Sequence, residues 1–237
     1  CFILFALPQI LNSHKMIKTY EKIFNQKTGI QLNLENFKIS VNKNLSFNIY
    51  SDKISSDENV FSVNELHYQS KILSAKPKKI NVKSIYFDID NSKKLLPKQK
   101  KDKKTAFDIN KFPFSIINIE KIYIKLNPDT NIELREIKSN KDKTKIIFKF
   151  KGVLNSKKLK YPMLLGKSGK LSYKKKLKFE DFSIDYSNAH VIISGSTDNL
   201  KFQGKNIEAD LINSSFIFFY RLKHPNKHSF IENFKNF

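Results

Sequence analysis

Apolar and polar residues alternate along most of the chain with a period of two. Between Ile30 and Ile89 the apolar positions form short runs with polar residues between them: Ile30, Leu32 and Leu34; Phe37, Ile39 and Val41; Leu45, Phe47 and Ile49; Phe61 and Val63; Leu66 and Tyr68; Ile80 and Val82; Ile85, Phe87 and Ile89. This alternation gives a strand one apolar and one polar face. It predicts an antiparallel sheet in which a polar turn closes each short strand.

The alternation returns after residue 105 and continues to Leu211. Asn127-Pro128-Asp129 is a strong reversal signal, and Ser194-Gly195-Ser196 also predicts a turn. Pro162 indicates an edge strand or a bulge. The sequence therefore predicts a mainly β protein with more than ten strands joined by hairpins. We expect one long, curved, mostly antiparallel sheet that forms an open groove or curls like a barrel.

One short pattern recurs at uneven spacing: polar residues, then an apolar–polar–apolar run. Its copies are Glu35-Asn36-Phe37-Lys38-Ile39, Asn64-Glu65-Leu66-His67-Tyr68, Lys83-Ser84-Ile85-Tyr86-Phe87, Glu120-Lys121-Ile122-Tyr123-Ile124 and Glu180-Asp181-Phe182-Ser183-Ile184. Because the spacing is uneven, the pattern does not predict a solenoid of fixed period. It indicates similar strands added to one sheet.

The N-terminal stretch Cys1–Leu11 is almost wholly apolar, and helical spacing follows over Leu11–Asn25. We interpret the first stretch as the end of a membrane anchor, with a buried or amphipathic helix as the alternative. Three regions follow: residues 1–26 as anchor remnant and helix, 27–215 as the β domain with a lysine-rich loop at 92–105, and 216–237 as an apolar and basic tail.

The chain is strongly basic, with 44 Lys and Arg against 22 Asp and Glu and a formal charge of +22 over 237 residues. This balance favours anionic partners such as lipid headgroups. Arginine, the usual residue for bidentate recognition of bases, occurs only at Arg135 and Arg221. We therefore expect no nucleic-acid partner. The lysine block Ser92–Thr105 is most simply a solvated loop.

No motif in the sequence predicts catalysis, a metal or a cofactor. His224 and His228 are four residues apart but have Pro225 between them. Asp88 and Asp90 alternate with apolar residues, which predicts that both lie on the polar face of a strand. Gly166-Lys167-Ser168-Gly169 lacks the glycine spacing of a phosphate-binding loop. We expect that the protein is not an enzyme.

A sheet with one apolar face must cover that face, and the sequence offers few helices for this purpose. Periodicity leaves two possibilities open, a filled core and a hydrophobic groove that takes acyl chains. The candidate groove residues are apolar strand positions: Phe37, Ile39, Phe47, Ile49, Ile85, Phe87, Ile122, Ile124, Phe148, Phe150, Phe182 and Ile184.

Several of these segments carry a family resemblance. They are Lys27-Thr28-Gly29-Ile30, Leu34-Glu35-Asn36-Phe37-Lys38-Ile39, Leu45-Ser46-Phe47-Asn48-Ile49, Phe61-Ser62-Val63-Asn64-Glu65-Leu66, Ile80-Asn81-Val82-Lys83-Ser84-Ile85-Tyr86-Phe87, Phe179-Glu180-Asp181-Phe182-Ser183-Ile184 and Val191-Ile192-Ile193-Ser194-Gly195. The chain resembles the membrane-proximal region of the AsmA-like family of bacterial envelope proteins, which includes relatives of TamB and YhdP. The resemblance implies an inner-membrane anchor and a periplasmic β-groove that binds or conducts phospholipid between the membranes, with no catalytic residues.

Two other functions fit the same patterns. An assembly factor for outer-membrane proteins would use exposed strand edges to bind a client strand and could have other envelope proteins as partners. A basic β protein that binds nucleic acid would show a steep salt dependence.

Overall fold

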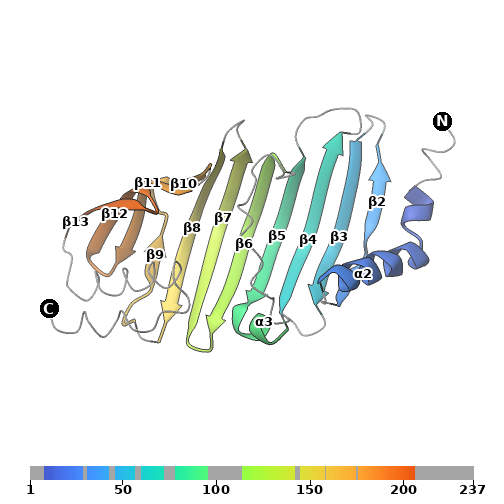
Figure 1. Ribbon diagram of the computed structural model, residues 1–237, viewed down its shortest axis with the longest axis horizontal. Helices are drawn as coiled ribbons and strands as arrows, with labels where there is room; N and C mark the ends of the chain where they lie inside the picture. The colour runs from blue at the N-terminus through green and yellow to red at the C-terminus, as the bar shows by residue number, and fades with distance from the viewer. Residues whose placement is uncertain are drawn as a thin grey trace.

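The protein folds around one sheet of 13 strands. The computed structural model describes residues 8–28, 31–42, 46–56, 60–71, 78–95, 114–141, 145–157, 159–174 and 176–205. Most of the strands form one layer that curls at its C-terminal end, and helix α2 (His14–Thr28) lies across its N-terminal end (Figure 1). The predictions of a mainly β fold and of a mostly antiparallel sheet are confirmed.

The described helices include α2 (His14–Thr28) and α3 (Ile89–Leu95). The strands are β1 (Leu32–Glu35), β2 (Lys38–Val41), β3 (Ser46–Ser56), β4 (Phe61–Lys71), β5 (Lys79–Asp88), β6 (Ile116–Asn127), β7 (Thr130–Lys141), β8 (Ile146–Ser156), β9 (Met163–Leu165), β10 (Lys170–Tyr173), β11 (Leu177–Tyr186), β12 (Ala189–Ser196) and β13 (Asn199–Lys205). Their order in the sheet follows the chain almost throughout, from β1 and β2 beside β3 to β13 at the far edge.

The pairing of β5 with β6 departs from the predicted meander, because these two strands are parallel. A parallel pair cannot be joined by a hairpin and needs a crossover connection. Residues 89–115 provide that crossover, and it begins with α3. The lysine block therefore starts inside a helix, since Ser92–Leu95 belong to α3, whereas residues 96–105 lie outside the described part of the chain.

Asp88 is the last residue of β5 and lies on the polar face of that strand, opposite Lys125, as predicted, but it is buried there and also starts α3. Its side chain is only 2% exposed, and its Oδ1 accepts a 3.0 Å hydrogen bond from the backbone N–H of Asn91. This is the geometry of a helix N-cap. Asp90 lies within the helix. The strand alternation continues to Ile89 in the sequence, so it does not indicate that the helix begins at this residue.

Helix α2 protects the N-terminal edge of the sheet. The side chain of Asn12, just before the helix, donates to the carbonyl of Ile39 at 2.8 Å and accepts from its N–H at 2.5 Å. Glu21 accepts a hydrogen bond from the backbone of Leu34 at 3.1 Å. The Tyr20 ring lies 5.8 Å from the Phe37 ring, centroid to centroid. The predicted helix is confirmed over most of its length, although it extends to Thr28.

Several predicted turns are irregular positions inside longer strands. We call these positions bulges, although the register shifts only in the β6–β7, β7–β8 and β11–β12 pairs. β4 contains both Phe61–Val63 and Leu66–Tyr68, and β6 contains Ile117–Ile119 and Ile122–Ile124 as well. Four non-glycine residues near these breaks have positive φ angles, namely Asn36 (48°), Glu65 (49°), Glu136 (53°) and Asp181 (51°). A left-handed residue within a strand breaks the alternation and puts two consecutive residues on one face.

The C-terminal part of the sheet encloses a packed core. The two short strands β9 and β10 both lie between β8 and β11. The core around them consists of Leu154, Met163, Leu165, Phe179, Phe182, Ile184, Ala189, Val191 and Ile193. β12 continues through the predicted turn at Ser194–Ser196, and the reversal comes one step later, at Thr197–Asp198.

Other predicted features fall outside the described residues. These are residues 1–7 of the anchor stretch, Gly29, Ile30, Leu45, the strand positions Phe107, Ile109, Ile207, Ala209 and Leu211, and the tail 216–237 with His224 and His228.

Candidate functional site

One face of the sheet carries an unbroken apolar row across ten strands. Residues that pair directly across neighbouring strands point to the same face. Following the pairs from β1 to β12 gives Leu34, Ile54, Val63, Ile85, Ile122, Leu134, Gly152, Leu165, Ile184 and Val191. Every side chain in this row is aliphatic, and Gly152 is the single position without one.

A second apolar row lies beyond the bulges, on the same face. Its members are Ile39, Ile49, Tyr68, Ile80, Ile117, Ser139, Phe148, Leu171 and Phe179, and the buried Ser139 interrupts the apolar series. On β8 the two rows are joined by plain alternation, since Phe148 and Gly152 are four residues apart. On β11 the rings of Phe179 and Phe182 lie 5.8 Å apart across the bulge, and both are buried. The bulges therefore keep both halves of each strand apolar on one side.

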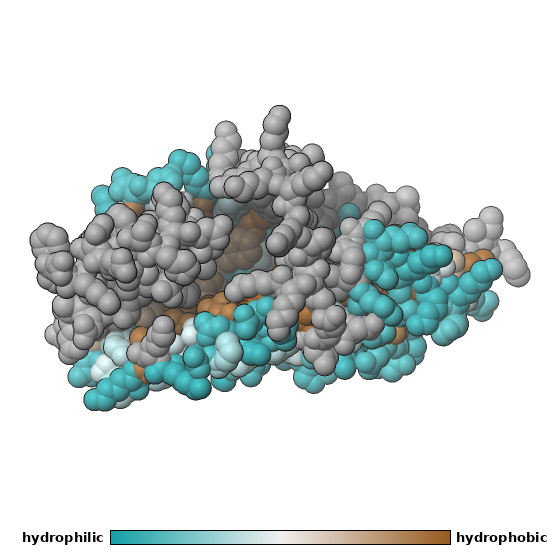
Figure 2. Space-filling model, turned by 60° about the horizontal axis from the view of Figure 1, so that its bottom comes forward, coloured by the Kyte–Doolittle hydropathy of each residue, from teal (hydrophilic) through white to brown (hydrophobic). Residues whose placement is uncertain are grey.

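Exposure changes along the first row. From β1 to β7 its side chains are half-buried, whereas from β8 to β12 the same row is buried. Gly152 marks the change: a Cβ there would lie 2.9 Å from Leu134 Cδ2 and 3.2 Å from Leu165 Cβ, so the absence of a side chain allows this packing. Figure 2 shows hydrophobic residues on the floor of a hollow, with hydrophilic residues around the outside.

Eleven of the twelve sequence-predicted residues lie in strands of this sheet, whereas Phe37 lies between β1 and β2 and contacts Tyr20 of α2. The twelve differ in burial. Phe182 and Ile184 lie in the packed core, and Phe150 packs against it with its ring 5.5 Å from that of Phe182. Ile39 is buried near the N-terminal edge. The remaining residues are half-buried or exposed: Phe37, Phe47, Ile49, Ile85, Phe87, Ile122, Ile124 and Phe148.

Further residues share this face and were not among the candidates. Ile54, Val63 and Leu134 complete the first row between candidate positions, and Ile80 and Ile117 do the same in the second. Their alternation in the sequence is the same as that of the candidates. The missing information was the strand register, which joins positions far apart in the chain.

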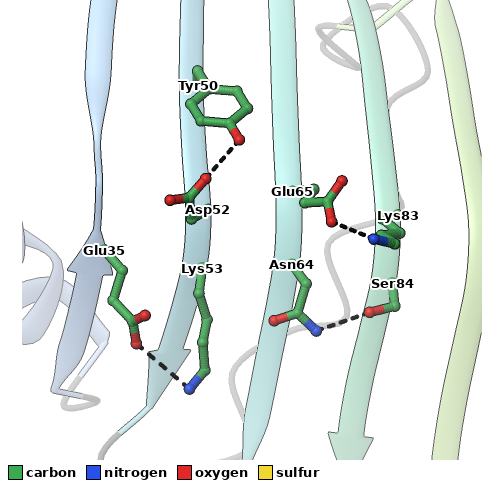
Figure 3. A pocket seen from close by; sticks show the side chains of 8 residues that line it. All are labelled: Glu35, Tyr50, Asp52, Lys53, Asn64, Glu65, Lys83 and Ser84. Atoms are coloured by element: carbon green, nitrogen blue, oxygen red, sulfur yellow. Dashed lines mark hydrogen bonds and ion pairs between the residues drawn. The ribbon is translucent and has the colours of Figure 1, made fainter.

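The opposite face is polar, and its bulge residues line a shallow depression on β1 and β3–β5. Pairs of consecutive residues, such as Asp52–Lys53 and Asn64–Glu65, point to this same side, as the bulges require (Figure 3). The other lining residues are Glu35, Tyr50, Lys83 and Ser84.

The carboxylates of this depression all have partners. Glu35 pairs with Lys53 at 3.4 Å and Glu65 with Lys83. The Tyr50 hydroxyl and the Asn36 amide donate to Asp52; these bonds hold the pKa of Asp52 below its ordinary value, and the pKa of Tyr50 is raised in turn. The hydrogen bond to Glu65 likewise raises the pKa of Lys83. Because its pKa is lowered, Asp52 is a weak general base, and the raised pKa keeps Tyr50 protonated.

The other chemical candidates also have structural roles. In the loop Gly166–Gly169 the N–H groups of Gly166 and Ser168 donate to the backbone and side chain of Ser183, each at 2.8 Å, so they are not directed at a phosphate. His190 pairs with Asp185 on the polar face. Within the described ranges no group of three or more His, Cys, Asp or Glu residues could hold a metal ion.

Comparison of the chain with known proteins identified no relative. No protein-family model, no curated protein and no solved structure matches the chain. In the part of the chain that the structure describes, no helix has both the length and the apolar character needed to cross a membrane. The resemblance to the AsmA-like family and the membrane anchor stay predictions.

Proposed function

We propose that this protein is a membrane-anchored envelope protein, and not an enzyme, whose apolar sheet face forms a groove for the acyl chains of phospholipids. The observation that carries the proposal is the apolar row that is packed in β8–β12 but only partly buried in β1–β7. Burying apolar surface gives about 25 cal/mol per Å², or about 0.8 kcal/mol per methylene group. An acyl chain on the half-exposed part of the row would gain this energy without unpairing a strand.

Lysines at one end of the strands provide positive charges that can bind the phosphate of a lipid headgroup. Lys71, Lys78 and Lys141 lie at the same end of the sheet: Lys71 pairs with Ser46 at the end of β4, and the backbones of Lys78 and Lys141 both bond to Ser115. An ammonium group binds phosphate as a compact charge. The proposed lipid therefore has its tails along the apolar rows and its phosphate at this end.

The membrane and the compartment follow from the same proposal. The apolar residues Cys1–Leu11 would anchor the chain in the inner membrane, and the sheet would lie in the periplasm and conduct lipid towards the outer membrane. This placement rests on the apolar stretch and on the family resemblance.

Photo-crosslinking from two adjacent positions of β6 tests the proposed groove. Ile122 belongs to the apolar row, whereas Lys121 next to it points to the polar face, where it pairs with Glu133 at 3.2 Å. A photoreactive residue at Ile122 should crosslink to phospholipid in cells, and the same residue at Lys121 should not. Equal lipid crosslinking from both positions, or none from Ile122 in a protein that folds, would contradict the proposal.

A further inference from the structure

The two edges of the sheet differ in how their backbone groups are protected. At the N-terminal edge Asn12 bonds both the N–H and the carbonyl of Ile39, and Glu21 accepts from Leu34. These contacts occupy groups that would otherwise pair with another strand. Natural proteins commonly cover edge strands in this way, because free edges recruit further strands.

The opposite edge is formed by β13, which is antiparallel to β12. Among the described residues no strand pairs with its other side. In an antiparallel strand half of the N–H and carbonyl groups point away from the paired neighbour. Phe202, in the middle of β13, is 48% exposed although it pairs with the buried Ile193 on the apolar face. One further strand would pair with the backbone and cover this ring.

The side chains of β13 indicate the chemistry of that strand. Leu200 and Phe202 lie on the apolar face because they pair with Gly195 and Ile193. Lys201 and Lys205 lie on the polar face, opposite Ser194 and His190, and neither forms an ion pair within the described residues. A strand that alternates apolar and acidic residues would complement both faces, because directly opposed side chains interact.

A second copy of the chain is a poor partner for this edge. If β13 paired antiparallel with itself about Gln203, Lys201 of each copy would lie opposite Lys205 of the other. Like charges that face each other across a strand pair are destabilising. In this register the like charges disfavour pairing with a second copy.

We propose that β13 binds an extended peptide segment of another protein in which apolar and acidic residues alternate, and that this segment adds a strand to the sheet. Backbone hydrogen bonds supply much of the affinity in this mode of recognition, and the alternate side chains supply specificity. The proposal does not depend on lipid binding, since the apolar face and the strand edge are separate surfaces.

Hydrogen exchange of the full chain with synthetic nine-residue peptides tests this proposal. A peptide that alternates valine and glutamate should slow exchange in β13 and leave Leu34 and Ile39 at the protected edge unchanged. The same peptide with all backbone nitrogens methylated should have no effect, because it cannot donate to the edge. Slowing by the methylated peptide, or no slowing by the unmodified one, would overturn the proposal.

A charge swap tests the assigned specificity. In the double variant Lys201→Glu, Lys205→Glu the valine–glutamate peptide should bind about tenfold more weakly, and a valine–lysine peptide should bind in its place. The matched control is Lys138→Glu, Lys149→Glu, which makes the same charge change at exposed positions of β7 and β8 and should keep the original preference. An unchanged preference in the β13 variant would overturn the role of the two lysines.

Discussion

Asp88 illustrates at the residue scale how one side chain can end a strand and start a helix. Its carboxylate accepts from the backbone of Asn91 and from Lys125 Nζ, both at 3.0 Å. The backbone hydrogen bond, followed by Lys125, holds the pKa of Asp88 below its ordinary value. Because the folded-state pKa is lowered, the charged form stabilises the fold above the unfolded-state pKa of about 3.9. This stabilisation is lost as the pH falls through the folded-state pKa.

Substitution of Asp88 should therefore have a pH-dependent cost. Asp88→Ala should lower the free energy of unfolding by about 2 kcal/mol at pH 7, because the cap and a buried acceptor are lost. Asp88→Asn keeps a capping side chain but no charge, so its difference from the wild type should shrink as the pH falls towards 2. Urea unfolding at both pH values measures this.

The exposed pair Asp129–Lys157, at 2.8 Å, provides the matched control. Asp129→Asn should change the free energy of unfolding by less than about 0.5 kcal/mol at pH 7. A difference between Asp88→Asn and the wild type that is the same at pH 7 and pH 2 would contradict the account of Asp88.

At the element scale, the bulges explain why the sequence predicted the strand positions but placed turns inside strands that are in fact continuous. Eleven of the twelve candidate residues, from Ile39 to Ile184, lie in strands as alternation predicted, whereas Phe37 lies between β1 and β2. A gap of three between apolar residues, as between Ile119 and Ile122, is equally compatible with a turn and with a bulge. Only pairing decides between them, because Ile119 and Ile122 both pair with the same neighbouring strands, β5 and β7. The parallel pairing of β5 with β6 could not be predicted either, because strand pairing is not encoded in the local alternation.

The positive φ angle of Glu136, at a bulge in β7, restricts which residue types are tolerated there. A β-branched residue tolerates a φ angle of 53° poorly, whereas asparagine adopts it readily. Glu136→Val should lower the free energy of unfolding by about 1–2 kcal/mol, and Glu136→Asn should be near neutral. Both variants remove the ion pair with Lys151, so thermal unfolding of the two separates backbone strain from lost charge. Equal destabilisation of both would contradict the strained-bulge account.

On the scale of the whole molecule, the sequence predicted an apolar face but not its division into an open and a packed part. That division comes from β9, β10 and the curled strands after them, which fill the core around Phe179 and Phe182. Local alternation is identical in both parts, as Ile122 and Ile184 show. The difference is which other strands lie against each residue, and this information is not local in the sequence.

The basic charge leads to a second expectation at this scale. Burial of acyl chains on the apolar rows is not screened by salt, so phospholipid should keep this part of its affinity at high ionic strength and lose only the contribution of the lysines at its phosphate. Binding of nucleic acid by lysines would instead weaken steeply as salt increases. Titration of the full chain with phospholipid and with duplex DNA at low and high salt distinguishes the two functions.

Native mass spectrometry of the full chain, purified from bacterial cells in mild detergent, tests whether the apolar sheet face binds phospholipid. We expect a folded protein that carries phospholipid, and loss of that lipid in Ile122→Asp but not in the polar-face control Lys121→Asp. A folded wild-type protein without any bound lipid would contradict the groove and indicate that its apolar face is covered by the chain itself.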